Sequence, residues 1–440
     1  MPTLSSRQRR FLNRCCHASF LVFVLTTVSS SFAQRPLEEV LKDKTVLQGL
    51  ADIEASRMLA ANQLVQIGGI VSPSGQEHER AHAVANLMRE VGLADIMVTR
   101  SPNVIGRIPG QSGQAIVFVS TLDDLATVAE HQRRASNPPV IEGNRVVGPG
   151  TNTSLTTIAL LSAARSLVKH NLSPQHDIVF AAVAQEETGL TGMRDLYDSY
   201  RDRAIAFVDV LGEGGSISYG ALGIHWWRVN ALGPPGHTLR GGLPNVNQGI
   251  ARAVDRILQI SEPRMYEDRR THLNVAILDS GAVFNHKPQS GWFSLDLRSL
   301  DQEHLESMES QTRIILAEVT RELGIRFEME PVSLTPSGQI PGALQSSLVQ
   351  NSLAISSFLG SNPHLSNAGS ANLNVAIANG TLAIGISSER GGRRGFVDEW
   401  ADLDVLLRTA KNVFLTAVIQ ADACLPQHVS AGSMTGSKRR

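Results

Sequence analysis

Apolar residues in the first half of the chain follow two alternating patterns. Residues 115–120 and 178–184 are almost continuously apolar, which is typical of strands buried on both faces of a parallel sheet. Residues 84–91 instead carry apolar side chains at helical spacing. Ser74 and Glu77 precede them in the pattern of a capping box at a helix start. The patterns therefore predict strands and helices in alternation.

The same alternation continues to about residue 210. Residues 129–147 are polar and predict a loop or hairpin, residues 148–153 predict a tight turn, and residues 155–168 predict an apolar helix. Strand, helix and strand repeated in this way predict a doubly wound α/β domain with a mostly parallel sheet.

A second pattern begins near residue 223. Its predicted strands lie at residues 226–232, 273–280, 291–298 and 326–332, and its predicted helices at residues 246–260 and 304–323. The order β-α-β-β-α-β predicts a small ferredoxin-like domain. Because the α/β pattern returns after residue 337, this domain is expected to be an insert within the first one.

The N-terminal residues have the character of a targeting segment. A basic stretch at residues 7–14 precedes an apolar run at residues 20–28 and a small-x-small site at residues 31–33. This predicts a signal peptide, residues 1–33, removed on export to the periplasm or outside the cell. The export route, general secretory or twin-arginine, stays open, and an uncleaved anchor is the alternative. No other stretch of the sequence is long and apolar enough to span a membrane.

Composition narrows the classes of partner and site. The 440 residues carry a formal net charge of -1, which gives no reason to expect nucleic acid or an anionic membrane as a partner. Of the three cysteines, Cys15 and Cys16 lie in the predicted signal peptide, and only Cys424 would remain. The mature chain is therefore expected to have no internal disulfide and no thiolate metal site. Residues 426–440 predict a disordered tail.

Acidic residues follow three predicted strands: Asp123, Glu186 with Glu187, and Asp209. In a doubly wound sheet the ligand crevice lies beyond the carboxyl ends of the strands. Adjacent carboxylates there suit a metallohydrolase, because one can bind a cation while the other takes a proton from the attacking water. A Glu-Glu pair alone is more often a solvated loop, so the prediction depends on the position that all four residues share.

Further motifs resemble a known family. They are Ser72-Pro73-Ser74-Gly75, Asn103-Val104-Ile105-Gly106, Glu186-Glu187, Gly233-Pro234-Pro235-Gly236-His237, Asn285 with Pro288, and Asp296-Leu297-Arg298. Over about residues 40–420, the chain resembles the dinuclear-zinc peptidases and amidohydrolases of the glutamate carboxypeptidase, peptidase T and aminoacylase type. The resemblance implies a peptidase-like α/β domain in two parts, residues 34–222 and 334–425. It also implies a dimerisation or lid domain at residues 223–333, and hence a homodimer.

The resemblance implies five metal ligands, of which this sequence retains two. Glu187 and Asp209 match the family's two terminal carboxylates. Thr121, Thr151 and Gly395 stand where the family has a histidine, a bridging aspartate and a second histidine. Zinc takes at least three protein ligands even in open catalytic sites, and threonine binds it poorly. The predicted zinc site is therefore degenerate.

Other residues bear on the same site. Arg393 and Arg394 precede Gly395 and would oppose a dication if their side chains point inward. A misaligned motif, with His131 or His364 as a substitute ligand, is the alternative to a lost metal site.

The resemblance also implies roles for the remaining site residues. Glu186 matches the family's general base, and Asp123 is retained from its His-x-Asp motif. His237 resembles the histidine that reaches across the dimer to the substrate carbonyl, and Asn285 and Arg298 resemble groups that hold the substrate carboxylate. The alternatives are a turn histidine for His237 and a surface charge for Arg298.

Two functions remain open. In the first, an exported protein keeps the scaffold and binds a peptide-like or N-acyl amino acid ligand without efficient hydrolysis, with little or no zinc. In the second, an active zinc-dependent peptidase or amidase hydrolyses a peptide or amide bond through a rearranged metal site. The count of retained ligands favours the first.

Overall fold

The computed structural model describes residues 35–212, 215–260, 270–386 and 388–422. The predicted signal peptide, the predicted tail and Cys424 lie outside the described residues. Within the described ranges, no helix has the combined length and apolar character needed to cross a membrane.

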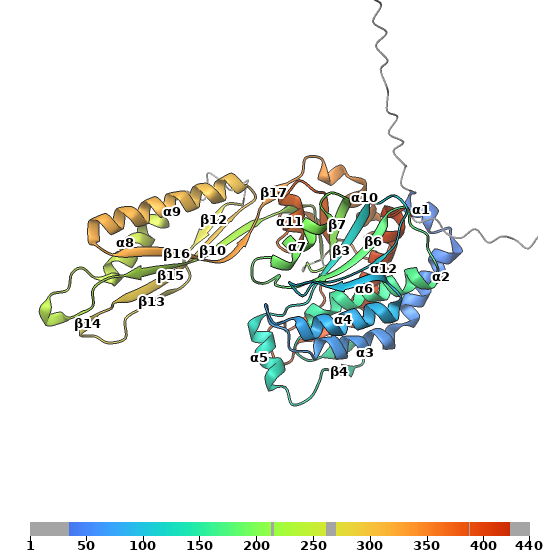
Figure 1. Cartoon of the computed structure of the whole chain (residues 1–440), viewed down its shortest axis with the longest axis horizontal. Helices are drawn as coiled ribbons and strands as arrows, with labels where there is room; N and C mark the ends of the chain where they lie inside the picture. Colours follow the sequence, from blue (N-terminus) through green and yellow to red (C-terminus); the bar gives the residue numbers. More distant parts are fainter. Residues whose placement is uncertain (1–34, 213–214, 261–269, 387, 423–440) are drawn as a thin grey trace, which may run out of the picture. The chain divides into compact units, whose positions relative to one another are not determined.

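A large mixed sheet forms the centre of the α/β domain (Figure 1). In spatial order its strands are β1 (Ala94–Val98), β2 (Val104–Ile108), β6 (Asp177–Val183), β3 (Ala115–Thr121), β7 (Ala204–Asp209), β19 (Ala383–Ile386), β8 (Ser216–Ser218) and β18 (His364–Ser366). β3 pairs in parallel with both β6 and β7, and β7 pairs in parallel with β19. The pairs β1–β2, β2–β6 and β8–β19 are antiparallel.

Helices cover both faces of this sheet. One face packs against α1 (Leu37–Val40), α2 (Lys44–Ala55), α3 (Arg57–Gly68), α4 (His78–Val91), α6 (Thr151–Lys169), α10 (Ser347–Phe358) and α12 (Leu403–Gln420). The other face packs against α7 (Thr191–Tyr200) and α11 (Leu373–Ala378). The doubly wound α/β prediction is therefore confirmed.

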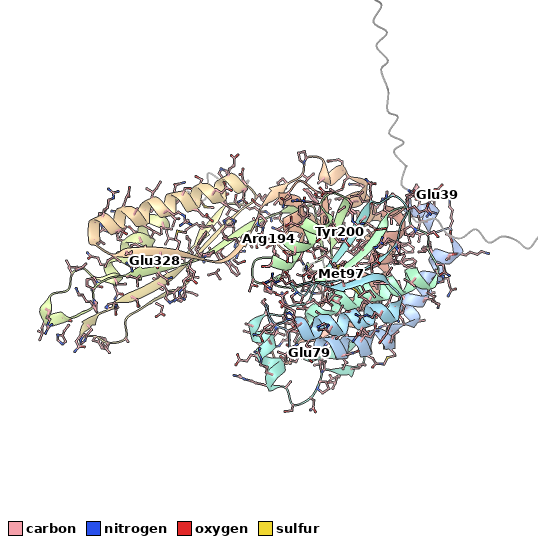
Figure 2. All side chains as sticks on the ribbon, viewed as in Figure 1. Glu39, Glu79, Met97, Arg194, Tyr200 and Glu328 are labelled. Atoms are coloured by element: carbon pink, nitrogen blue, oxygen red, sulfur yellow. The ribbon has the colours of Figure 1, made fainter. Side chains whose placement is uncertain are left out.

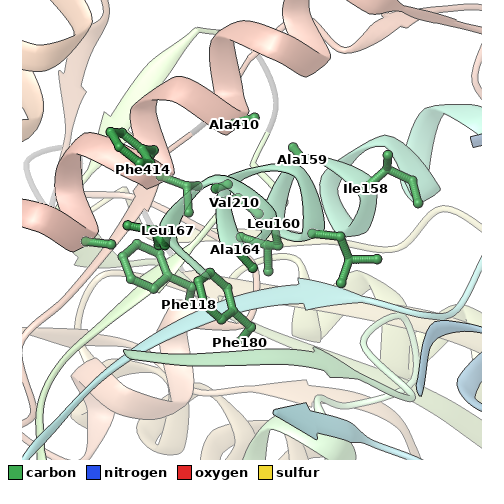
Figure 3. Packing of buried hydrophobic residues seen from close by; sticks show 14 of the residues in the cluster. Phe118, Ile158, Ala159, Leu160, Ala164, Leu167, Phe180, Val210, Ala410 and Phe414 are labelled. Atoms are coloured by element: carbon green, nitrogen blue, oxygen red, sulfur yellow. The ribbon is translucent and has the colours of Figure 1, made fainter. Parts of the chain in front are cut away.

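Burial on both faces explains why the central strands are continuously apolar. Phe118 of β3 and Phe180 of β6 point to the first face, where their rings stack with centroids 5.8 Å apart against α6 (Figure 3). Val117 and Val119 of β3 point to the second face. Because neither face meets water, apolar residues are favoured along most of each strand.

The insert has its own sheet and core. Its elements are β10 (Gly223–Leu232), α8 (Val246–Ile257), β12 (His272–Asn274), β13 (Leu278–Ser280), β15 (Ser290–Ser299), α9 (Gln302–Leu323) and β16 (Arg326–Thr335). The strand order is β12-β15-β10-β16, with β13 also pairing with β15. Trp227, Val229 and Ala231 alternate along β10 and are buried against both helices. This is the ferredoxin-like arrangement that the sequence predicted.

Short elements complete the described chain. They are α5 (Ala126–Arg134), β4 (Val140–Glu142), β5 (Arg145–Val147), β9 (Gly220–Ala221), β11 (Gly236–His237), β14 (His286–Lys287), β17 (Gly338–Gln339), β20 (Gly391–Gly392), β21 (Trp400–Asp402), and the 3₁₀ helices η1 (Thr238–Arg240) and η4 (Ala343–Gln345). The hairpin predicted within residues 129–147 is thus β4–β5, but helix α5 precedes it where a loop was predicted.

Helix α6 begins four residues earlier than the sequence predicted. Gly150 precedes it with φ +89°, a left-handed conformation that favours glycine. The buried carboxylate of Glu399 accepts hydrogen bonds from the backbone N–H groups of Gly150 at 3.0 Å and Asn152 at 3.1 Å. A remote side chain therefore caps this helix, which a local pattern cannot show.

The capping box predicted at the start of α4 is also wrong. Helix α4 begins at His78, and Ser74 Oγ donates to Asp123 Oδ2 at 2.6 Å instead of capping the helix. Glu77 Oε1 accepts from the backbone N–H groups of Gly75 and Gln185. Both side chains are therefore used at the carboxyl end of the sheet.

Replacing Glu399 tests the remote cap. Glu399 also accepts from the Gly395 N–H at 3.1 Å, so Glu399→Ala leaves three backbone donors without their acceptor. We expect the free energy of unfolding in urea to fall by about 3 kcal/mol. Exposed Asp398 pairs with Arg393 on the surface and serves as the control. Asp398→Ala should change the free energy of unfolding by less than about 0.5 kcal/mol. Equal losses in the two variants would contradict the cap.

The other end of α6 gives a pH-dependent prediction. Hydrogen bonds from Lys169 and, less strongly, His170 lower the pKa of Asp52 in α2 to about 2, below its usual range. A lowered carboxyl pKa stabilises the fold above about pH 4 and stops doing so as the pH falls towards 2. Asp52→Asn should cost about 1 kcal/mol at pH 7, because exposed Lys169 is screened by solvent.

Urea unfolding of wild type and Asp52→Asn between pH 7 and pH 2.5 measures this difference. The difference in free energy of unfolding between wild type and Asp52→Asn should become smaller below pH 4. Exposed Asp202 provides the control, and Asp202→Asn should show no such narrowing. A gap that stays constant across the range would argue against a lowered Asp52 pKa.

Candidate functional site

The predicted acidic residues come together at the carboxyl ends of β3, β6 and β7. Asp123 follows β3, Glu186 and Glu187 follow β6, and Asp209 ends β7. β3 lies between β6 and β7 in the sheet, so the three strand ends are neighbours. Asp123 and Asp209 are buried, whereas the glutamates are partly exposed.

Asp123 holds the Glu-Glu turn in place. Its Oδ1 accepts from Thr121 Oγ1 at 2.8 Å and from the Glu186 N–H at 2.9 Å. Its Oδ2 accepts from Ser74 Oγ at 2.6 Å and from the Glu187 N–H at 3.1 Å. Both oxygens are thus engaged by protein donors, and the role that this structure supports for Asp123 is positioning.

Glu186, Glu187 and Asp209 have raised pKa values. Burial raises the pKa of Glu186 well above its usual range, and the charges of Glu187, Asp123 and Asp209 add to the increase. Burial also raises the pKa of Glu187 and brings the pKa of Asp209 to about 6. Backbone N–H groups of Leu211 and Leu373 donate to Asp209 and partly offset its burial.

Arginine side chains enter this acidic region. Arg394 Nη2 lies 2.6 Å from Glu187 Oε1. Arg390 is 2% exposed; its Nε donates to Asn152 Oδ1 at 3.1 Å, and its Nη1 donates to the carbonyl of Leu211, just after β7. Arg393 instead lies on the surface, paired with Asp398. The sequence therefore identified Arg394 as a candidate but missed Arg390, which no motif distinguishes.

Thr121, Thr151 and Gly395, where the resemblance leads us to expect metal ligands, form hydrogen bonds within the protein. Thr121 donates to Asp123, and Thr151 Oγ1 donates to the carbonyl of Gly148 at 2.8 Å. Gly395 has φ +86°, and its N–H donates to Glu399. None of these positions presents a nitrogen or carboxylate to a metal.

The site residues predicted in the insert lie at two separate locations. Asn285 Nδ2 lies 3.3 Å from His237 Nε2 on the β11–β14 hairpin. Arg298 lies near the end of β15 that pairs with the start of β10, opposite Ile224, and donates to Asp296 at 3.0 Å. Within one chain the structure therefore brings His237 and Asn285 together but leaves Arg298 at the other end of β15.

A small cavity adjoins the glutamates. It has a volume of about 130 Å³ and is lined by Glu186 and Glu187, by Trp226 of β10, and by Ser333 and Ser370. Nearby, Arg194 of α7, labelled in Figure 2, donates to the carbonyl of Leu334 in β16 at 2.9 Å. The helix after the Glu-Glu turn is thus bonded to the strand that leaves the insert.

The side chains of the described residues do not fit a zinc centre. Across residues 35–212, 215–260, 270–386 and 388–422, no group of three or more His, Cys, Asp and Glu side chains is arranged to hold a metal ion. His131 on α5 and His364 on β18 do not complete such a group. Arg394 moreover forms an ion pair with Glu187, a carboxylate that a bound metal would need as a ligand.

Comparison with known proteins agrees with the motifs. The family model described as Peptidase family M28 matches residues 103–219, which span Asp123, Glu186, Glu187 and Asp209. The succinyl-diaminopimelate desuccinylase of Corynebacterium glutamicum is 24% identical over 283 residues, covering 62% of this chain and 74% of that protein.

Solved structures show the same fold. Aminopeptidase PepT of Bacillus cereus superposes with a TM-score of 0.66 at 18% identity, over 83% of this chain and 98% of that one. A dinuclear metal-binding peptidase of the M20 family from Bacillus subtilis superposes with a TM-score of 0.61 at 13% identity, over 84% and 99% of the two chains. The family model, the sequence match and the shared fold all support the resemblance to the metallopeptidases and amidohydrolases of the glutamate carboxypeptidase, peptidase T and aminoacylase type.

Proposed function

We propose that this protein binds a peptide-like or N-acyl amino acid ligand on a metallopeptidase scaffold without hydrolysing it efficiently. The observation that carries the proposal is the hydrogen bonding of Thr121, Thr151 and Gly395 within the protein. Each stands at an expected ligand position, and each is bonded to the protein instead of offering a metal-binding group.

The chemistry of amide hydrolysis supports this reading. A bound zinc ion lowers the pKa of its water to about 7 and polarises the carbonyl. Glu186 alone offers general acid–base catalysis, typically worth about 10²–10⁴-fold. Burial and the neighbouring carboxylates raise the pKa of Glu186, so a smaller fraction of it is ionised at a given pH. Without a metal-activated water, turnover should be slow.

The class of ligand follows from the family. The relatives named above are a desuccinylase and an aminopeptidase, whose names denote an N-acyl amino acid and a peptide. We propose that the cavity beside Glu186 receives the part of the ligand that carries the amide. Arg298 of one protomer and Asn285 of the other are proposed to hold its carboxylate together in a dimer.

A homodimer formed through the insert is part of this proposal. His237 and Asn285 lie beside exposed apolar side chains, Leu239, Leu243 and Phe284, which suit burial in an interface. In the dimer, His237 of one protomer would serve the site of the other. The signal-peptide pattern of residues 1–33 supports export to the periplasm or outside the cell.

An active peptidase or amidase with a rearranged metal site is the second candidate. Its supporting observation is that Glu186, Glu187 and Asp209 are all retained at adjoining strand ends. Metal content separates the two candidates.

Elemental analysis of the mature protein is the deciding measurement. Protein purified without chelator, offered excess zinc and then desalted should retain much less than one zinc per chain. Chelator should leave its melting temperature unchanged, because no metal contributes to folding. A dinuclear peptidase of the same fold is the positive control.

The opposite results have clear meanings. About two zinc ions per chain, with hydrolysis of dipeptides or N-acyl amino acids, would overturn the binding function and establish the second candidate. Calorimetric titration with the same compounds should show binding without product formation.

A further inference from the structure

We propose that Arg394 and Arg390 supply within the protein the positive charge that metal ions supply in the dinuclear peptidases, and that they exclude divalent cations from the site. This inference rests on the proposed non-hydrolytic function and deepens it.

The first contact is between Arg394 and Glu187. The distance of 2.6 Å from Nη2 to Oε1 is that of a charge-assisted hydrogen bond, and each side chain is 26% exposed. Glu187 is the carboxylate expected to bind one metal. With a guanidinium on one of its oxygens, it is not available as a strong ligand for a dication.

The second contact involves Arg390 and the end of β7. Its buried guanidinium bonds Asn152, beside the replaced bridging position, and the carbonyl of Leu211, two residues after Asp209. Its charge also acts favourably on the Asp209 carboxylate. Asp209 is the carboxylate expected to bind the other metal. A cation thus stands near each retained ligand.

The two arginines match in charge the two carboxylates that are expected to bind metal. Glu187 and Asp209 carry two negative charges when ionised, and Arg394 and Arg390 carry two positive ones. A buried carboxylate without a cation is costly, so loss of the metals alone would have left these side chains uncompensated. The arginines remove that cost and repel a dication over the same distances.

Variants of Arg394 test the ion pair. Arg394→Met should lower the melting temperature of metal-free protein by about 3 °C, because Glu187 loses its partner. Adding Glu187→Gln should recover most of that loss, since the unpaired charge is then absent. The neighbouring Arg393 is the matched control, and Arg393→Met should shift the melting temperature by less than about 1 °C. Equal effects of the two arginine variants, or no recovery in the double variant, would refute the pairing.

Restored ligands test the exclusion of metal. The variant with Thr121→His, Thr151→Asp and Gly395→His regains the expected donors, yet Arg394 should keep its affinity for zinc weak. Adding Arg394→Met should raise zinc affinity at least 100-fold, estimated roughly from the repulsion between a guanidinium and a dication. Adding Arg393→Met should not raise it, and adding Arg394→Lys should raise it far less, because Lys keeps the charge.

The two experiments keep this inference separate from the proposed function. Zinc binding by wild type would overturn the binding function. If wild type binds no zinc and Arg394→Met changes neither stability nor the affinity of the restored variant, the function stands and the charge replacement fails. Circular dichroism and gel filtration verify folding of the restored variants, and the melting experiment decides the ion pair without them.

Discussion

A charged group can be buried only with a partner, and this constraint organises the whole carboxyl end of the central sheet. The acidic side chains gathered there are Glu77, Asp123, Asp124, Glu186, Glu187, Asp209 and Glu399. Backbone N–H groups satisfy some of them, as at Asp123 and Glu399. Arginines satisfy others: Arg80 pairs with buried Asp124 at 2.6 Å, and Arg394 pairs with Glu187. Asp123, Asp124, Glu187 and Glu399 thus have partners within the protein.

The fold could be predicted to a large extent from local patterns. The buried strands β3 and β6 are apolar at most positions because both faces are covered, and the alternation along β10 reflects one face packed on helices. The start of α6 and the role of Ser74 were mispredicted for one shared reason. Their hydrogen-bond partners, Glu399 and Asp123, are distant in sequence, and spacing rules describe only neighbours.

The site was less predictable because it depends on the direction of side chains. Motifs placed the acidic residues at the strand ends where the structure has them, but they could not decide which arginine points inward. Arg393 has φ +59° in the left-handed region, and its side chain goes to the surface while that of Arg394 reaches Glu187. Arg390 lies outside every motif, and its burial follows only from the packing of the completed chain.

The remote cap of α6 has a consequence for synthesis of the chain. Glu399 follows Gly150 by 249 residues, and the whole ferredoxin-like insert is translated between them. At ribosomal rates of about 5–20 residues per second, Glu399 is synthesised roughly 12–50 s after the first turn of α6. During that interval the N–H groups at the start of α6 lack the carboxylate that accepts their hydrogen bonds in the folded protein. The α/β domain therefore reaches its native state only after translation has passed its C-terminal segment, and the insert can mature before its host.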